Sequence, residues 1–221
     1  MKAIVFVDVQ KDFIDGALKN EQAIAVTPKI VEFAKQCVAD PNCKLYATRD
    51  THEATKYFPN DKFDITKLED FCKDPNSFNE KPLIMTGYLA TLEGQRLQKE
   101  HCIEGTDGWM IDNRLMEVLD GKCTFVNKPT FGSFDLAEVI KEDIDKFNED
   151  HKNCRDDFEP FNEIILCGFC TDICCVSCAL LLRAKFPNTK ITIMKDLCAG
   201  TTKENHEAAL KVMQSCQIDI K

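Results

Sequence analysis

Short apolar runs rich in valine and isoleucine alternate along this chain with longer amphipathic stretches. The apolar runs cover residues 3–7, 44–47, 124–127, 164–168 and 190–194, and each has the length and composition of a strand buried on both faces. Apolar residues recur at spacings of three and four in residues 25–38, 110–119, 136–147, 172–185 and 203–215, a pattern typical of helices with one buried face. This alternation predicts an α/β fold with a parallel sheet, and residues 217–221 offer a sixth strand.

Two segments interrupt the alternation. Residues at about 53–88 contain three prolines and scattered charges without clear periodicity, and they are too many for an ordinary connection, so we expect an inserted segment near a site. Residues at about 149–160 are polar and mostly acidic, as in a solvated surface loop. Because 221 residues suffice for one large core, we expect a single domain spanning 1–221 that includes both segments.

Composition excludes several partners and compartments. The chain has 28 Lys and Arg against 37 Asp and Glu, a formal charge of -9, whereas nucleic acids and anionic membranes are bound by clustered basic residues. The first apolar run ends at Asp8 and eighteen apolar residues never occur together, so neither a signal peptide nor a membrane span is expected. We therefore expect a small-molecule partner and a cytoplasmic protein, in which the 13 cysteines are free thiols.

Reactive side chains follow four of the predicted strands. Asp8 follows the first, Asp50 and His52 the second, Lys128 the third, and a cysteine-rich stretch at 168–174 the fourth. Since the carboxyl ends of parallel strands meet at one edge of a sheet, these groups are expected to converge.

Three of these residues suggest nucleophilic catalysis. Thr171 or Asp172 is a suitable N-cap, which would place Cys174 in the first turn of a helix, where the backbone N–H groups favour a thiolate. With Lys128 to stabilise the thiolate and Asp8 to take its proton, Cys174 would suit acyl transfer from an amide or ester. Without Cys174, Asp8 and Lys128 would be read as a structural ion pair.

A metal site is also predicted. Asp50 and His52 are two residues apart in an extended segment and point the same way, and with His101 and Glu93 they form a mixed histidine and carboxylate set that suits zinc, iron or manganese. A second metal hypothesis uses Cys167, Cys170, Cys174 and Cys178, but Cys167 lies inside a predicted strand and cannot easily share one tetrahedral centre. The remaining histidines, His151 and His206, are expected on the surface.

Five stretches of sequence, in the same order along the chain, carry a family resemblance. They are Asp-Val-Gln-Lys-Asp-Phe at 8–13, Arg-Asp-Thr-His at 49–52, His-Cys-Ile-Glu-Gly-Thr-Asp-Gly at 101–108, Lys-Pro-Thr-Phe-Gly-Ser-Phe at 128–134 and Gly-Phe-Cys-Thr-Asp-Ile-Cys-Cys-Val at 168–176. Together they resemble the isochorismatase-like cysteine hydrolases and, within that superfamily, most of all the nicotinamidases.

The resemblance implies a fold and a reaction. The fold would be a doubly wound sheet of six parallel strands with helices on both faces, a Rossmann-like three-layer arrangement. Cys174 would attack a carboxamide, Asp8 would pass its proton to ammonia, and Lys128 would steady the charges, with water hydrolysing the thioester. The resemblance also implies a cis peptide between Phe169 and Cys170, and an oxyanion hole made by the N–H groups of Cys170 and Cys174.

The resemblance further implies a ligand set and a substrate. Asp50, His52 and His101 fall on the positions that hold a divalent metal, and Glu93 is the candidate fourth ligand. The metal, expected to be zinc with iron or manganese as alternatives, would hold the pyridine nitrogen of nicotinamide. Phe13 and Phe131 would contact the ring.

Three functions therefore remain open. The first is hydrolysis of nicotinamide to nicotinate and ammonia, in NAD salvage. The second keeps the triad but acts on another small amide, ureido or vinyl-ether compound, since Thr51 and Gln98 replace aromatic residues that relatives often have at these positions. The third is a catalytically silent binding protein, which the intact triad disfavours. Because members of the family often associate, a homo-oligomer is also open.

Overall fold

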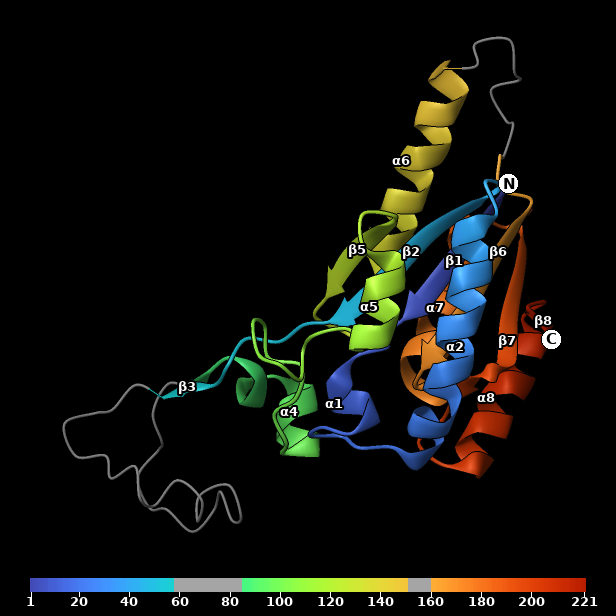
Figure 1. Cartoon of the computed structure of the whole chain (residues 1–221). Coiled ribbons are helices and arrows are strands. Elements are labelled where there is room, and N and C mark those ends of the chain that lie inside the picture. The colour runs from blue at the N-terminus through green and yellow to red at the C-terminus, as the bar shows by residue number, and fades with distance from the viewer. Residues whose placement is uncertain (58–84, 151–159) are drawn as a thin grey trace.

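The fold is built around one six-stranded parallel sheet, seen in the computed structural model of the chain (Figure 1), which describes residues 1–57, 85–150 and 160–221. Its strands are β1 (Lys2–Val7), β2 (Cys43–Asp50), β5 (Cys123–Lys128), β6 (Glu163–Phe169), β7 (Lys190–Ala199) and β8 (Asp219–Ile220). They lie in the order β5-β2-β1-β6-β7-β8, and every neighbouring pair is parallel. The predicted α/β class and the sixth strand are confirmed.

The strand order reverses at β1. From β1 the chain winds outward through β2 to β5, then crosses back to β6 and winds the other way through β7 to β8. Residues 3–7 of β1 are completely or almost completely buried, as expected of a central strand. In a doubly wound sheet, loops diverge at the reversal and leave a crevice beyond the carboxyl ends of the strands. A functional site is therefore expected beyond the carboxyl ends of β1 and β6.

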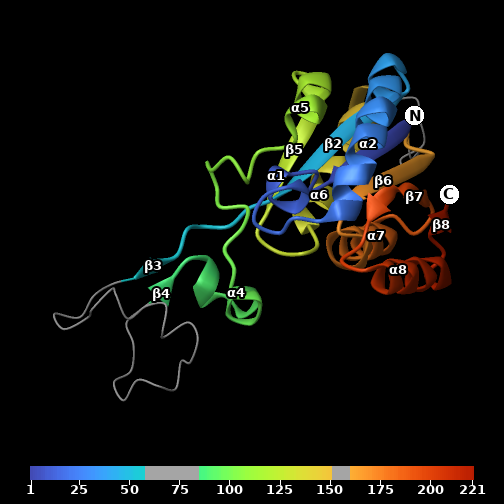
Figure 2. The same ribbon diagram turned by 60° about the horizontal axis from the view of Figure 1, so that its bottom comes forward.

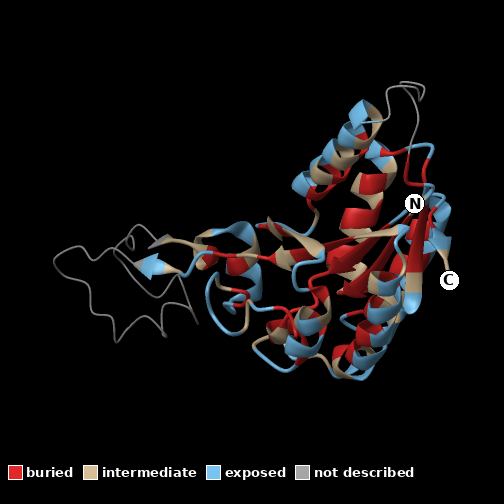
Figure 3. Cartoon of the chain, turned by 45° about the horizontal axis from the view of Figure 1, so that its top comes forward, coloured by how far each residue is buried: buried red, intermediate tan, exposed pale blue. Residues whose placement is uncertain are grey.

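Helices cover both faces of the sheet. Helices α2 (Glu21–Ala39) and α5 (Asn113–Leu119) lie on one face, and α6 (Phe134–Asp150), α7 (Val176–Lys185) and α8 (Lys203–Ser215) lie on the other (Figures 1 and 2). The buried residues concentrate in the strands and on the helix faces that meet them (Figure 3). The doubly wound, three-layer prediction is confirmed. Among the described residues, no helix is both long and apolar enough to cross a membrane.

Smaller elements occupy the connections at the carboxyl edge of the sheet. Helix α1 (Lys11–Ile14) follows β1, and a 3-10 turn (Tyr88–Ala90) and helix α4 (Leu92–Leu97) precede the chain's return to α5. An antiparallel pair, β3 (Lys56–Tyr57) and β4 (Met85–Thr86), lies apart from the main sheet (Figure 2). It marks the start and end of the predicted insertion, whose interior, 58–84, lies outside the described residues. The same holds for 151–159 of the predicted acidic loop.

Candidate active site

Asp8 is the first residue after β1 and is completely buried at the sheet edge. Its backbone is in the left-handed region, with φ of 48°, a conformation that costs a non-glycine residue about 1–3 kcal/mol and is concentrated at functional sites. Thr48 of β2 holds it in two ways: the hydroxyl donates to Asp8 Oδ1 at 2.6 Å and accepts from the Asp8 N–H at 3.2 Å. The carboxylate is thus fixed by the neighbouring strand.

Lys128, the last residue of β5, places its ammonium group at the centre of the site. Its Nζ lies 2.7 Å from Asp8 Oδ2, 3.4 Å from Asp50 Oδ1 and 3.4 Å from Cys174 Sγ, and it donates to the carbonyl oxygen of Thr130 at 3.0 Å. The side chain is only 1% exposed. One buried cation therefore touches two carboxylates and a thiol that come from three other segments of the chain.

Burial and neighbouring charges shift the pKa values of Asp8 and Lys128 in opposite directions. Burial raises the pKa of Asp8 above its ordinary value, and the charge of Lys128 offsets part of that effect. Burial would lower the pKa of Lys128, but the charges of Asp8, Cys174 and Asp50 hold that pKa well above its ordinary value. Lys128 therefore stays a cation, and Asp8 is a stronger base than a solvated aspartate.

Cys174 lies in a π-helical turn, Thr171–Cys175, which connects β6 to α7. The turn places Cys174 at the start of the helix, as predicted, but neither predicted residue is its cap. The N-cap is Cys170, which makes no side-chain capping bond, because the side chains of Thr171 and Asp172 bond elsewhere. Burial raises the pKa of the Cys174 thiol well above its ordinary value, only partly offset by Lys128. The resting group is a neutral thiol, so a base must remove its proton.

The chain that leads into this turn passes close to β1. The peptide between Phe169 and Cys170 is cis, as the resemblance implies. Gly168, with φ of +126°, lies where a Cβ atom would come within 2.0 Å of the carbonyl oxygen of Val7. Only glycine allows β6 to lie this close to β1 one residue before Asp8. Asp8 and the cysteine turn are brought together by this approach.

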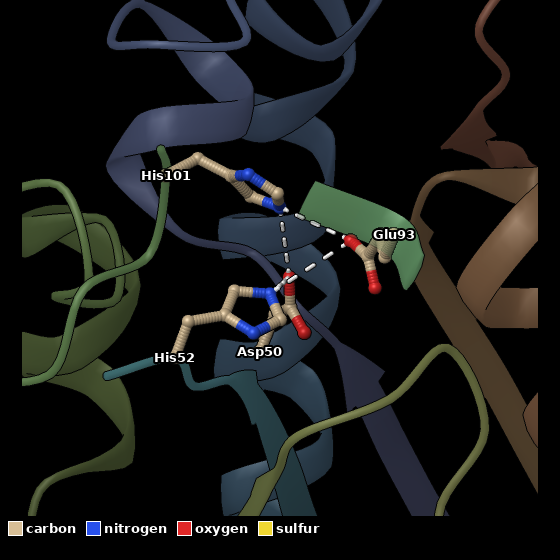
Figure 4. Close-up of side chains that lie close together, drawn as sticks. All are labelled: Asp50, His52, Glu93 and His101. Atoms are coloured by element: carbon tan, nitrogen blue, oxygen red, sulfur yellow. Dashed lines mark hydrogen bonds and ion pairs between the residues drawn. The ribbon is translucent and has the colours of Figure 1, made fainter. Parts of the chain in front are cut away.

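Four ligand-type side chains converge beside the triad (Figure 4). The Nε2 atoms of His52 and His101 lie 3.1 and 3.2 Å from Asp50 Oδ2. They lie 3.9 and 3.8 Å from Glu93 Oε1. Donor atoms around a tetrahedral zinc ion, each about 2.0–2.2 Å from it, are separated by about 3.4 Å. The four side chains thus have the identity and spacing that a divalent metal requires.

Surrounding groups orient these candidate ligands. His101 Nδ1 donates to the carbonyl oxygen of Lys99 at 3.2 Å, which leaves the lone pair on Nε2 facing the cluster. The hydroxyl of Tyr88 donates to Glu93 Oε1 at 3.2 Å, and its ring lies 4.4 Å from that of His52. Gln10 binds both the N–H and the carbonyl oxygen of Asp50, each at 2.8 Å. Such support is typical of metal centres.

The alternative four-cysteine metal site is not supported. Within the described residues, Asp50, His52, Glu93 and His101 form the one set of His, Cys, Asp or Glu side chains whose donor atoms converge. Cys167 and Cys178 are buried in the core, where burial raises the pKa values of both thiols. They are packing residues, as expected for most of the cysteines.

The nucleophile and three of the four candidate metal ligands line one cavity of about 1250 Å³. Cys170 and Cys174 line it together with Asp50, Glu93 and His101. Both predicted ring contacts line it as well. Phe13 is buried with its ring 5.6 Å from that of His101, whereas Phe131 is 43% exposed. The thiol and three of the candidate metal ligands therefore face one space.

Several residues of the site were not identified from the sequence. Thr48 directly follows one predicted strand and Gln10 lies three residues beyond another. A polar residue near a strand end is the signal that could have identified them. Tyr88 belongs to the segment without periodicity, where no pattern indicates a role in the site. His206, predicted to be a surface residue, is instead half-buried and hydrogen-bonded to Thr171, while His151 lies outside the described residues. Trp109 donates to Thr51 Oγ1 at 2.9 Å.

Comparison with known families agrees with this architecture. A family model described as the isochorismatase domain matches residues 2–220. The chain therefore belongs to the isochorismatase family, whose members include hydrolases, and the predicted family is confirmed. No curated protein sequence matches the chain significantly.

Solved structures match over the whole chain. Nicotinamidase/pyrazinamidase PncA from Bacillus subtilis is 22% identical, with 99% of this chain and 98% of that one covered and a TM-score of 0.62. The pyrazinamidase of Pyrococcus horikoshii, solved in complex with zinc, is 20% identical, with 100% and 98% covered and a TM-score of 0.62. Yeast nicotinamidase Pnc1p, bound to the inhibitor nicotinaldehyde, is 14% identical, with 100% and 99% covered and a TM-score of 0.63. At identities of 14% to 22%, these matches establish the fold of this chain.

Proposed function

We propose that this protein hydrolyses a small carboxamide through a thioester on Cys174, and that the substrate is nicotinamide, converted to nicotinate and ammonia. The observation that carries the proposal is the position of Lys128, whose ammonium contacts Asp8, Cys174 and the metal-ligand candidate Asp50. Lys128 thereby joins the base and the nucleophile to the metal cluster, and Cys174 lines the same cavity as Asp50, Glu93 and His101. The nicotinamidase names of the structural neighbours agree with this substrate.

The reaction begins with transfer of the Cys174 thiol proton to Asp8. Burial raises the pKa of Asp8, which makes its carboxylate a better proton acceptor than a solvated aspartate. Sγ then forms a bond with the amide carbon, and the negative charge that develops on its oxygen is received by the N–H groups of Cys170 and Cys174. Asp8 returns the proton to the leaving nitrogen, the C–N bond breaks, and ammonia departs from a thioester.

Water completes the cycle. Asp8 takes a proton from a water molecule, whose oxygen attacks the thioester carbon, and the C–S bond breaks to release the carboxylic acid. The departing sulfur regains the proton, which restores the neutral thiol. Throughout, Lys128 stabilises negative charge on Asp8 and on the sulfur, both of which its ammonium contacts.

Asp50, His52, Glu93 and His101 would hold a divalent metal, for which we propose zinc, with iron or manganese as alternatives. Such an ion, when bound, accepts the lone pair of a pyridine nitrogen and so orients the ring. The edge of Phe13 beside His101 and the exposed face of Phe131 would pack against that ring. The zinc in the Pyrococcus horikoshii neighbour agrees with this assignment.

We also propose a role in NAD salvage, in the cytoplasm. Every cysteine of the described residues is a free thiol, including the exposed Cys216. Free thiols are typical of proteins in reducing compartments.

Ammonia release from nicotinamide, measured with the purified protein, tests the proposal. We expect Cys174→Ala to remove the activity, because no other thiol of the described residues contacts Lys128, and Cys178→Ala to serve as a matched control that retains it. We expect a chelator to lower the activity and added zinc to restore it. Undiminished turnover by Cys174→Ala would overturn the mechanism.

The choice of substrate is tested separately. A panel of small amide, ureido and vinyl-ether compounds is assayed beside nicotinamide with the same protein. A higher kcat/KM for one of them, with the same dependence on Cys174, would retain the mechanism and replace nicotinamide as the substrate.

A further inference from the structure

The catalytic turn is attached to the N-terminal end of α8 by two side-chain links. Thr171, which is completely buried, shares a hydrogen bond of 2.8 Å between its Oγ1 and Nδ1 of His206. Asp172 Oδ1 accepts the Thr201 N–H at 2.8 Å, and Asp172 Oδ2 accepts the Thr201 hydroxyl. Thr171 and Asp172, which could have capped the turn, therefore bind His206 of α8 and Thr201 just before it instead.

The segment on the other side of these links is itself held in place. Asn20 donates to the carbonyl oxygen of Gly200 at 2.8 Å, and Asn205 donates to Thr201 Oγ1 at 3.0 Å. A Cβ atom on Gly200 would lie 2.7 Å from Cβ of His206 and 3.0 Å from Asp172 Oδ1. The Gly200 backbone therefore lies directly against both links, and α8 offers the turn a fixed support.

Backbone hydrogen bonds from Ile173 and Cys175 to the Cys170 carbonyl oxygen, and burial in the core, also hold the turn, but the two links are the side-chain hydrogen bonds that join it to α8 and the residues just before it. The N-cap of the turn, Cys170, contributes no side-chain hydrogen bond. Yet the turn carries Cys174, whose Sγ must stay 3.4 Å from Lys128 Nζ, and the N–H groups proposed to receive the oxyanion. Displacements well under 1 Å already weaken such preorganised hydrogen bonds.

We propose that His206 and Asp172 are positioning residues that hold the catalytic turn against α8, so that Cys174 and the oxyanion N–H groups meet the reacting carbonyl. Neither residue touches the substrate in this scheme; His206 acts through Thr171 and Asp172 through Thr201. The proposal rests on the proposed function where it concerns the reaction. The position of Cys174, however, can also be tested without substrate, through the reactivity of its thiol.

The first experiment is a double-mutant cycle on the hydrogen bond between Thr171 and His206. Thr171→Val removes the hydroxyl at nearly constant volume, and His206→Ala keeps the Cβ that packs against Gly200. Loss of one hydrogen bond corresponds to about a fivefold fall in kcat in each single variant. Because both variants remove the same bond, we expect the double variant to fall no further, and KM to stay unchanged.

The same three variants are tested without substrate. The rate of Cys174 alkylation by iodoacetamide, followed on its peptide by mass spectrometry, reports the contact between the thiol and Lys128. We expect it to fall by the same factor in the single and double variants, because the shifted turn moves Sγ away from the ammonium. Glu207→Ala, an exposed substitution on the same helix, serves as the matched control and should leave the rate unchanged.

Variants that restore the hydrogen bond distinguish a positioning role from a general contribution to stability. His206→Asn carries polar atoms near the position of Nδ1, and Thr171→Ser keeps the hydroxyl, so both should recover most of the lost kcat. The thermal unfolding temperature of every variant is measured in parallel. A lower unfolding temperature with unchanged kcat and unchanged alkylation would reduce the bond to a structural role and overturn the proposal, as would fully additive effects in the cycle.

The second link is tested in the same way with Asp172→Asn, which keeps one acceptor oxygen, and Asp172→Ala, which keeps none. We expect alkylation of Cys174 to be slower in Asp172→Ala than in Asp172→Asn, and equal rates would overturn this half of the proposal. If the wild-type protein does not hydrolyse nicotinamide, the proposed function fails. The alkylation measurements would still decide whether the turn is held from α8.

Discussion

At the scale of single residues, Lys128 is the group on which the arrangement depends most. Its ammonium is almost completely buried and contacts the carboxylates of Asp8 and Asp50 and the thiol of Cys174. Two carboxylates would repel each other in this position without the cation between them. Stability and function therefore depend on the same side chain.

We expect Lys128→Met to destabilise the protein by about 3–5 kcal/mol, because it leaves the buried carboxylate of Asp8 without its counter-ion and removes one of the partners of Asp50. Urea unfolding of both proteins in a chelator measures the difference. Lys185→Met provides the control, since Lys185 pairs with Glu138 on the surface, where such pairs contribute about 0–1 kcal/mol. A loss no larger than that of the control would show that Lys128 does not hold the buried charges together.

Which residues the sequence could identify depended on how each one reaches the site. Asp8, Asp50 and Lys128 end strands, and strand ends meet at one edge in any parallel sheet, so periodicity alone located them. Tyr88 and His206 reach the site through contacts between distant segments, which no local pattern encodes. Burial is a further property that no local pattern encodes: a helix terminus favours a thiolate at Cys174, but its burial raises the pKa of the thiol, and burial depends on the whole fold.

At the scale of elements, the approach of β6 to β1 determines where the triad forms. The predicted strands and helices are present because apolar periodicity is a local property, although β7 continues to Ala199 beyond its predicted end. What the pattern could not show is how closely two strands approach. At Gly168 the backbone of β6 lies against the carbonyl group of Val7, in a conformation that residues with a Cβ rarely adopt.

We expect Gly168→Ala to lower the free energy of unfolding by about 3 kcal/mol or more, because it combines an unfavourable φ with a steric overlap. Gly121→Ala is the matched control, since Gly121 also has a positive φ, of +64°, but has open space around it. Its substitution should cost only about 1–2 kcal/mol. Denaturant unfolding compares the two, and equal losses would mean that the contact with Val7 carries no energy of its own.

At the scale of the whole molecule, the metal cluster connects two parts of different character. Asp50 lies at the end of a central strand, whereas Glu93 belongs to α4, in which Gly94 is the buried residue. The segment around α4 is joined to the sheet by a few backbone bonds, such as those of His52 with Cys102 and Glu104. A helix that buries only a glycine opens at low free energy unless something else holds it.

A bound metal would therefore protect this segment more than the sheet. A ligand present at 100 times its dissociation constant stabilises the folded state by about 2.7 kcal/mol. On addition of a chelator, we expect amide hydrogen exchange to accelerate strongly in residues 88–104 and little in residues 3–7 of β1. Hydrogen exchange read by mass spectrometry on peptides from both regions measures this. His52→Ala, which lacks a ligand, should exchange at the accelerated rate with or without chelator. Uniform acceleration across the chain would show that the metal does not act as a local link between α4 and the sheet.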